Sequence, residues 1–214
     1  MLGKTDGAVH DSAPAWLPDG QQIAYVSKLG SNLGEELFVI DADGGTPRRL
    51  TTTTEREVAP SWSPDGAEIV YLFYWWDEVE EEARGDLYAI NVTTGAVRQL
   101  TDAPGLEWYP DWSPDGRFIA YSRDTFRPEL GPHEEIFLLD VATGEEWMLT
   151  ETLPRAPFQD FLEPQWLPGQ TLDLSITVME LSTSDLGAEP HYRVDLRVAR
   201  RPPRSGSARP TLSP

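Results

Sequence analysis

The stretch YPDWSPDG at residues 109–116 decides the fold, because its last five letters, WSPDG, already occur at residues 62–66. Near copies lie on either side of these two. "PAWLPDGQQIAYVS" begins at Pro14, and "PQWLPGQTLDLSIT" begins at Pro164. A motif that recurs at a near-regular interval of tens of residues indicates a repeat architecture. The aligned tryptophans are Trp16, Trp62, Trp112 and Trp166.

A second shared phrase follows each of the first three copies: "ELFVIDADGGTPRRLT", "DLYAINVTTGAVRQLT" and "EIFLLDVATGEEWMLT". Together the two phrases predict four strands per unit, of which the first ends at Trp and the fourth ends in Leu-Thr. The Ser-Pro-Asp-Gly between the first two strands favours a tight turn, because Pro fixes φ and Gly closes the turn. The second strands, at residues 23–26, 69–74 and 119–122, are rich in β-branched and aromatic residues.

The predicted strands are apolar on successive residues rather than on alternate ones, so both faces of each sheet must be buried. Stacked radially, as blades, each sheet covers its neighbour. A Trp packed between two blades would contribute about 1.5–3 kcal/mol by burial. We therefore expect an all-β protein, a β-propeller of about four four-stranded antiparallel blades.

The repeated pattern resembles the TolB-like, WD-repeat-like β-propeller family. The resemblance rests on Pro-x-Trp-(Ser/Leu)-Pro-Asp-Gly-x-x-Ile-(Ala/Val)-Tyr, followed by an Asp- or Asn-containing strand end, a Gly turn and Leu-Thr. It implies a propeller that typically has six blades and serves as an extracytoplasmic binding protein or as the substrate-gating domain beside a serine peptidase domain. It covers residues 1–199, with blades expected at about 6–51, 52–101, 102–150 and 151–199.

The fourth copy departs from the pattern, since it lacks the Asp of the turn and no Leu-Thr strand follows it. Two alternatives follow. The segment MLGKT at residues 1–5 resembles the Leu-Thr strand, so it could complete the fourth blade and close a small ring. Otherwise the chain is part of a larger propeller, and a homodimer becomes a reasonable expectation. A stable monomer in solution would favour the closed ring.

The chain is strongly acidic, with 36 Asp and Glu against 17 Lys and Arg and a net charge of −19. Nucleic acids and anionic membranes require a cationic surface, so neither is expected as a partner, and a cationic protein or peptide is. The charge is uneven, because residues 193–214 carry six Arg against one Asp. The Pro-, Ser- and Arg-rich composition of residues 200–214 predicts a disordered tail or linker. The alternative is that this tail folds back on the acidic body or binds an acidic partner.

Catalytic signatures are missing from the sequence. It has no cysteine, which excludes disulfides, thiolate catalysis and Cys-type zinc sites. It also has no G-x-S-x-G, H-E-x-x-H or phosphate loop, and its three His residues lack ligand-like spacing. We therefore expect no enzymatic activity, metal or cofactor, although a propeller hydrolase or lyase with a channel metal is a third, weaker alternative.

The sequence contains no apolar run that suits a signal peptide or a membrane span. No membrane insertion is expected. The family resemblance suggests a periplasmic or other extracytoplasmic location, whereas a chain that truly starts at Met1 would be cytoplasmic.

Carboxylates recur five residues before the aligned Trp, in a strand expected to line the central channel. They are Asp11, Glu57 and Glu107, whereas the fourth unit has Phe161 at this position with Asp160 beside it. Carboxylates in equivalent positions could ring the channel mouth and attract a cation or a basic side chain. An ordinary polar loop before a strand is the alternative.

The loops on the opposite side of the blades from the Ser-Pro-Asp-Gly turns vary most between units, as functional loops often do. The longest, "WWDEVEEEARGD" at residues 75–86, places Trp75 and Trp76 beside five acidic residues. Exposed aromatic side chains there would anchor a cationic peptide. The alternative is that both Trp continue a buried strand and the acids are a solvated loop.

Two functions from different classes remain. The first is a non-catalytic, TolB-like binding module that presents an acidic loop face and channel mouth to a protein or peptide. The second is the substrate-gating propeller fragment of a serine peptidase of the prolyl-oligopeptidase kind, whose catalytic domain lies outside this chain.

Overall fold

The computed structural model describes residues 8–29, 34–127, 131–152, 159–167, 173–180 and 191–197. The described elements are strands, apart from one turn of 3-10 helix at Thr150–Thr152. The prediction of an all-β protein is confirmed. The proposed closing strand at residues 1–5 and the predicted tail at 200–214 lie outside the described residues.

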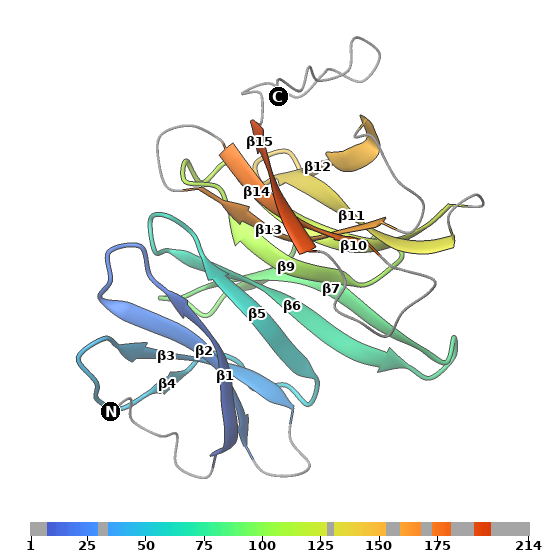
Figure 1. Ribbon diagram of the computed structural model, residues 1–214. Helices are drawn as coiled ribbons and strands as arrows, with labels where there is room; N and C mark the ends of the chain where they lie inside the picture. Colours follow the sequence, from blue (N-terminus) through green and yellow to red (C-terminus); the bar gives the residue numbers. More distant parts are fainter. Residues whose placement is uncertain are drawn as a thin grey trace.

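The strands form four successive antiparallel units, coloured from blue to red along the chain (Figure 1). The first unit contains β1 (Ala8–Trp16), β2 (Gln22–Leu29), β3 (Glu35–Asp41) and β4 (Arg48–Arg49). The second contains β5 (Arg56–Trp62), β6 (Glu68–Asp77), β7 (Glu82–Asn91) and β8 (Val97–Gln99). The third contains β9 (Glu107–Trp112), β10 (Phe118–Arg127), β11 (Gly131–Asp140) and β12 (Glu145–Met148). The described strands of the fourth are β13 (Gln159–Trp166), β14 (Asp173–Glu180) and β15 (His191–Arg197).

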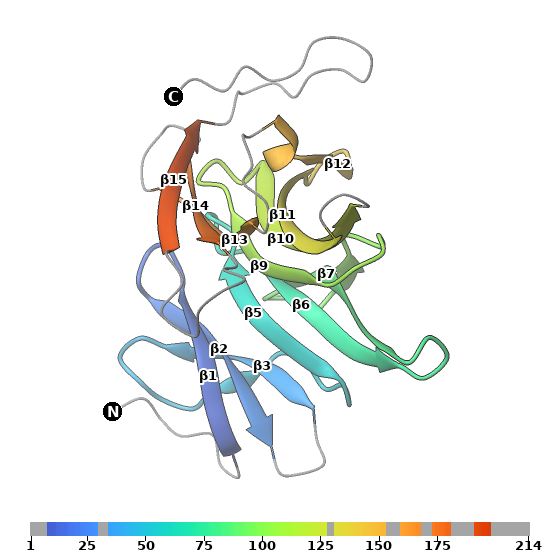
Figure 2. The same ribbon diagram turned by 45° about the vertical axis from the view of Figure 1, so that its right-hand side comes forward.

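The first strands of the units, β1, β5, β9 and β13, contact one another in this order, and the units follow one another around them (Figure 2). Within the described residues, no contact of comparable extent joins β13 back to β1. A short parallel pairing of Glu35 with Arg56 connects the first two units into one sheet. At this crossing a Cβ on Gly34 would lie 1.7 Å from the Glu55 carbonyl oxygen, so only glycine fits.

Hydrophobic cores fill the spaces between neighbouring units, as the doubly apolar strands predict. Trp62 packs with residues of β2 and β3, Trp112 with β6 and β7, and Trp166 with β10 and β11. Each of these tryptophans therefore covers the sheet of the preceding unit. Trp16 is 59% exposed, because no sheet precedes the first unit among the described residues.

The Ser-Pro-Asp-Gly segments form the predicted tight turns. The Gly66 amide donates to the Ser63 carbonyl at 2.9 Å, and Gly66 has the positive φ of 71° that favours glycine. The sequence alone does not indicate the role of the serine. The Ser63 hydroxyl donates to Asp65 at 2.7 Å and accepts from the Glu68 amide, which fixes the turn to the second strand. Ser113 does the same in the third unit.

A second regularity lies three residues before each aligned Trp, where a residue other than glycine has a left-handed backbone. Each of these residues precedes a proline and coincides with a register shift between the first and second strands, which marks a bulge. The left-handed conformation costs an L-residue about 1–2 kcal/mol. The repeated x-Pro-x-Trp motif therefore bends the end of every first strand in the same way. The four residues are Ala13 (φ 48°), Ala59 (φ 52°), Tyr109 (φ 53°) and Glu163 (φ 47°).

Candidate functional site: a pocket at the ends of the first strands

A cavity of about 760 Å³ lies where the four bulged strands end. We call it the channel pocket and define it by residues 14–16, 59–62, 109–112 and 163–166, which line it in the four units. Pro18, Pro64 and Pro114 of the turns also line the cavity, so it opens on the face that carries these turns. Its volume falls in the range of pockets that enclose small ligands or a few peptide residues.

The residue just before the aligned Trp points into this pocket and links neighbouring units. The Ser61 hydroxyl donates to Asp111 Oδ1 at 3.0 Å, and the Trp166 amide donates to Asp111 Oδ2 at 2.9 Å. Asp111 thus joins the second, third and fourth units. Burial raises the pKa of Asp111 to about 6, an effect that its hydrogen bonds oppose. The carboxylate is therefore largely ionised at neutral pH.

Indole hydrogen bonds support the same arrangement. Trp62 Nε1 donates to the Ala15 carbonyl at 3.1 Å, and Trp166 Nε1 donates to the Asp111 carbonyl at 3.0 Å. Each bond runs from one unit to the residue before Trp in the preceding unit. Trp112 Nε1, at the equivalent position, is buried without a partner among the described residues.

The open part of the channel pocket is aromatic and negatively charged. Trp16 is 59% exposed, Tyr109 is 44% exposed, and Glu163 contributes an exposed carboxylate to the same lining. The described lining residues include Asp111 and Glu163 but no Arg, Lys or His. Aromatic faces and carboxylates without a competing cation favour a positively charged ligand.

The structure does not bring the four predicted mouth carboxylates into one open ring. Asp11 is exposed, whereas Glu57 and Glu107 are both 0% exposed. Asp160 is nearly buried and accepts a hydrogen bond from the Glu134 amide at 3.0 Å. Glu57 and Glu107 therefore present no surface to a partner in this structure.

The buried glutamates instead connect units through the Thr of the Leu-Thr phrase. The Leu37 amide donates to Thr51 Oγ1 at 2.9 Å, and Thr51 Oγ1 donates to Glu57 Oε2 at 3.0 Å. Thus the hydroxyl joins β3 of one unit to β5 of the next. Burial raises the pKa of Glu57 to about 7, with Thr53 and Thr51 opposing the rise.

The same connection recurs in the second unit and changes in the third. In the second unit the Leu87 amide donates to the Thr101 hydroxyl, which donates to Glu107 of the third unit. Thr150, in contrast, donates to Glu135 of its own unit, because the position equivalent to Glu57 is occupied by the buried Phe161. The signal for this contact in the sequence is the recurrence of Leu-Thr six residues before Glu, at Thr51 and Glu57 and again at Thr101 and Glu107.

Trp75 and Trp76 lie on the long hairpin of β6 and β7. Adjacent strand residues point to opposite faces, and Trp75 is half-buried against Phe73, with ring centroids 5.8 Å apart, whereas Trp76 is 54% exposed. Both tryptophans line a shallow hollow of about 310 Å³ together with Glu55, Phe73 and Tyr88. We call it the hairpin pocket.

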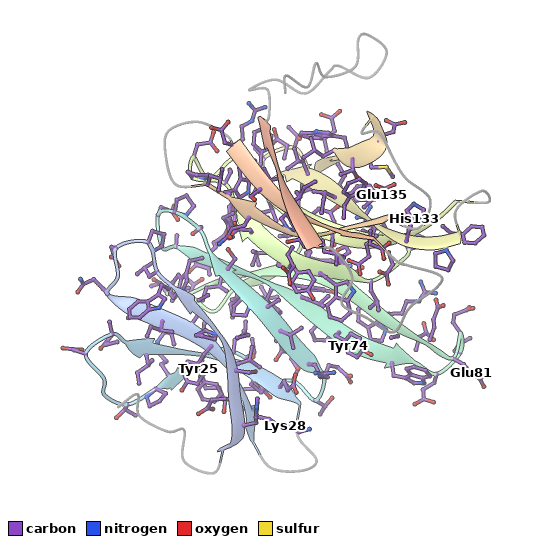
Figure 3. The ribbon with its side chains drawn as sticks, in the orientation of Figure 1. Tyr25, Lys28, Tyr74, Glu81, His133 and Glu135 are labelled. Carbon is purple, nitrogen blue, oxygen red and sulfur yellow. The ribbon has the colours of Figure 1, made fainter. Side chains whose placement is uncertain are left out.

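The hairpin pocket and the channel pocket lie at opposite ends of the second unit. β6 begins at the Ser-Pro-Asp-Gly turn and runs away from it, toward the hairpin tip. Figure 3 shows Glu81 at this projecting tip, where its φ of 53° closes the turn. The two pockets are therefore two separate surfaces.

The described residues contain no cluster of three or more His, Asp or Glu side chains arranged to hold a metal ion. His133 and Glu135, labelled in Figure 3, approach each other at 3.2 Å, but both are buried and Glu135 also accepts from Thr150. Among the described residues, no helix is long and apolar enough to cross a membrane.

Comparison with known proteins places the sequence in a family. The profile described as the TolB beta propeller domain matches residues 3–157. No curated protein matches the sequence.

Several solved structures share the fold. A putative TolB from Agrobacterium tumefaciens is 20% identical with a TM-score of 0.60, and the match covers 91% of this chain and 69% of that one. A structure from a study of two prolyl endopeptidases is 16% identical with a TM-score of 0.59, and covers 95% of this chain and 29% of that one. An oligogalacturonate lyase in complex with manganese is 13% identical with a TM-score of 0.58, and the match covers 85% of this chain and 48% of that one. At these identities the likeness concerns the fold alone.

Proposed function

The chain belongs to the TolB β-propeller domain family, and on that premise we propose that it is a non-catalytic binding module that holds a cationic segment of a protein or peptide partner. The channel pocket is the proposed contact site. Trp16, Tyr109 and Glu163 present aromatic faces and a carboxylate on its rim, and Asp111 adds a second carboxylate deeper inside.

One observation carries this proposal: the same backbone bulge occurs at the pocket in every unit. Four left-handed residues that are not glycine together cost several kcal/mol by the general scale of about 1–2 kcal/mol each. Such conformations persist where the surrounding structure enforces them, and they concentrate at binding sites. Here they shape one pocket out of four separate strands.

The hairpin pocket is a second candidate contact, as the sequence predicted for Trp75 and Trp76. Its exposed Trp76 and the acidic residues around the hairpin tip suit a cationic partner in the same way. A short segment cannot fill both pockets, because they open at opposite ends of the second unit. We therefore assign the channel pocket the primary role, and a large partner could use both.

The alternative function, a substrate-gating propeller beside a serine peptidase domain, is supported by the shared fold with the prolyl endopeptidase. This chain spans 29% of that protein. Reading the gene on either side of the present sequence decides between the two functions. A peptidase domain in the same open reading frame favours gating, and its absence favours the independent binding module.

The test measures the dissociation constant between the full chain and a defined probe, an alternating Arg-Pro peptide, at low ionic strength. Glu163 is exposed, and among the described residues its carboxylate accepts a single long hydrogen bond, 3.4 Å from the Thr177 hydroxyl. Its substitution should therefore change the pocket charge without unfolding the protein. We expect Glu163→Lys to weaken binding by about tenfold or more, because one attraction becomes a repulsion.

The matched control is Glu145→Lys, which makes the same charge change at an exposed position of β12 outside the pocket. Equal loss in both variants would show that only net charge matters and would contradict a pocket. No measurable binding of the probe, either to the wild type or to a variant whose C-terminal arginines are replaced by glutamate, would also contradict the proposal.

A further inference from the structure

We infer that the chain's own arginine-rich segment, residues 198–214, docks in the channel pocket and competes there with a partner. The inference rests on the proposed function, because both depend on an acidic, aromatic pocket that takes a cationic polypeptide. It goes further than the proposed function because it names one ligand for the pocket, residues 198–214 of the same chain.

The strand register places the start of this segment on the pocket face. Trp166, which lines the pocket, pairs with Leu174 of β14, and Leu174 pairs with Leu196 of β15. Asp173 pairs with Arg197, the last residue of β15. Two strand spacings of about 4.8 Å put the end of β15 about 10 Å from the Trp166 backbone.

The composition of the segment complements the pocket. Residues 198–214 contain Arg200, Arg201, Arg204 and Arg209 and no acidic residue, although the whole chain has a net charge of −19. The segment "RRPPRSGSARPTLSP" also contains four prolines, of which two, Pro202 and Pro203, separate Arg201 from Arg204. Proline-rich segments in an extended helix dock on aromatic-lined grooves, and the planar guanidinium group both stacks on aromatic rings and pairs with carboxylates.

The pocket offers the matching groups. Its lining combines the exposed rings of Trp16 and Tyr109 with the exposed carboxylate of Glu163 and the more buried carboxylate of Asp111. No basic lining residue competes for these carboxylates among those described. The opposite arrangement, an acidic tail, would be repelled by this surface.

The length of the segment is sufficient for docking within one molecule. In the extended conformation of Pro-rich segments, at about 3.1 Å per residue, the 17 residues from 198 to 214 reach at most roughly 50 Å. This exceeds the distance from Arg197 to the pocket. Tethering over such a span gives an effective concentration in the millimolar range, so even a weak contact is populated. A partner must then displace the segment, which raises the affinity that it needs.

The first test reverses the charge of the segment in the full chain, with Arg200→Glu, Arg201→Glu and Arg204→Glu combined. The probe is the alternating Arg-Pro peptide. Removing the internal competitor should tighten probe binding by about tenfold or more relative to the wild type. Adding Glu163→Lys to this variant should remove the gain.

The outcomes separate the two proposals. If the reversed-tail variant and the wild type bind the probe equally, the segment does not occupy the pocket, and the binding module stands. If neither binds the probe, the pocket does not take cationic peptides, and both proposals fail. A gain that survives Glu163→Lys would place the segment elsewhere on the acidic surface and would overturn the inference.

The second test exploits the absence of cysteine in the chain. Gln165→Cys, at an exposed lining residue that keeps the pocket carboxylates, combined with Ser207→Cys should cross-link within one molecule at high dilution under mild oxidation, and high salt should suppress the reaction. Glu81→Cys with the same Ser207→Cys is the control, because Glu81 lies at the distant hairpin tip (Figure 3). Equal reaction of both pairs, no reaction of the first pair, or products that join only separate molecules would each overturn docking in cis.

Discussion

Trp62 and Trp112 occupy the same repeat position but differ in one hydrogen bond. Trp62 Nε1 donates to the Ala15 carbonyl, whereas the buried Trp112 Nε1 has no partner among the described residues. We expect Trp62→Phe to lower the free energy of unfolding by about 1 kcal/mol more than Trp112→Phe, because only the former loses a hydrogen bond. Denaturant unfolding of both variants measures the difference.

The Trp112→Phe variant serves as the internal control for volume, since both changes remove the same atoms from a core between two sheets. A larger loss in Trp112→Phe would contradict the assignment of the indole contacts. At this scale the sequence predicted the packing role of the tryptophans correctly, because apolar periodicity determines which side chains are buried. It could not distinguish the two indoles, since hydrogen-bond geometry depends on the neighbouring unit.

At the scale of strands, neighbouring units are joined through the Leu-Thr phrase that follows the fourth strand. Thr51 accepts from the Leu37 amide and donates to Glu57. Thr51→Val keeps the shape but leaves a buried amide and a buried carboxylate each short of a partner, which should cost about 2–4 kcal/mol of unfolding free energy. Thr51→Ser retains the hydroxyl, so it should lose clearly less. Thermal or denaturant unfolding provides the comparison, and equal losses would rule out the proposed role of the hydroxyl.

The element scale also shows the limits of prediction from sequence. The four-strand unit and its first turn followed from periodicity and from the chemistry of Pro, Asp and Gly. The positive φ at Ala59 and Tyr109 did not, because a residue before proline ordinarily prefers an extended backbone. The channel pocket depends on these bulges, which the sequence does not predict. The variation between the loops therefore favoured contact residues on the opposite face of the blades. The recurrence of Glu57 and Glu107 suits a structural contact as well as a binding site, and sequence alone does not distinguish the two.

The whole molecule carries a net charge of −19, and several of its carboxylates are buried. Burial raises the pKa of Glu57 from 4.5 to about 7. Between these values the unfolded chain ionises first, so the folded state binds more protons and its stability falls as the pH rises. Above about pH 7 the contribution of protonated Glu57 to the free energy of unfolding is lost completely.

We therefore expect the melting temperature to fall from pH 5 to pH 8, and Glu57→Gln to reduce this fall, because the amide cannot ionise. Glu145→Gln, which removes an exposed carboxylate, controls for the change in net charge. A melting temperature that rises over this range in the wild type, or an identical fall in Glu57→Gln, would contradict the burial of an ionisable Glu57.

The most direct test of a cation-binding channel pocket follows the indole signals of the eight tryptophans by NMR. The reversed-tail variant of the full chain is titrated with the alternating Arg-Pro peptide. Binding in the channel pocket predicts a large shift for Trp16 and unchanged signals for Trp75 and Trp76, which lie at the opposite end of the second unit. Shifts confined to Trp75 and Trp76, or no shift at all, would contradict it.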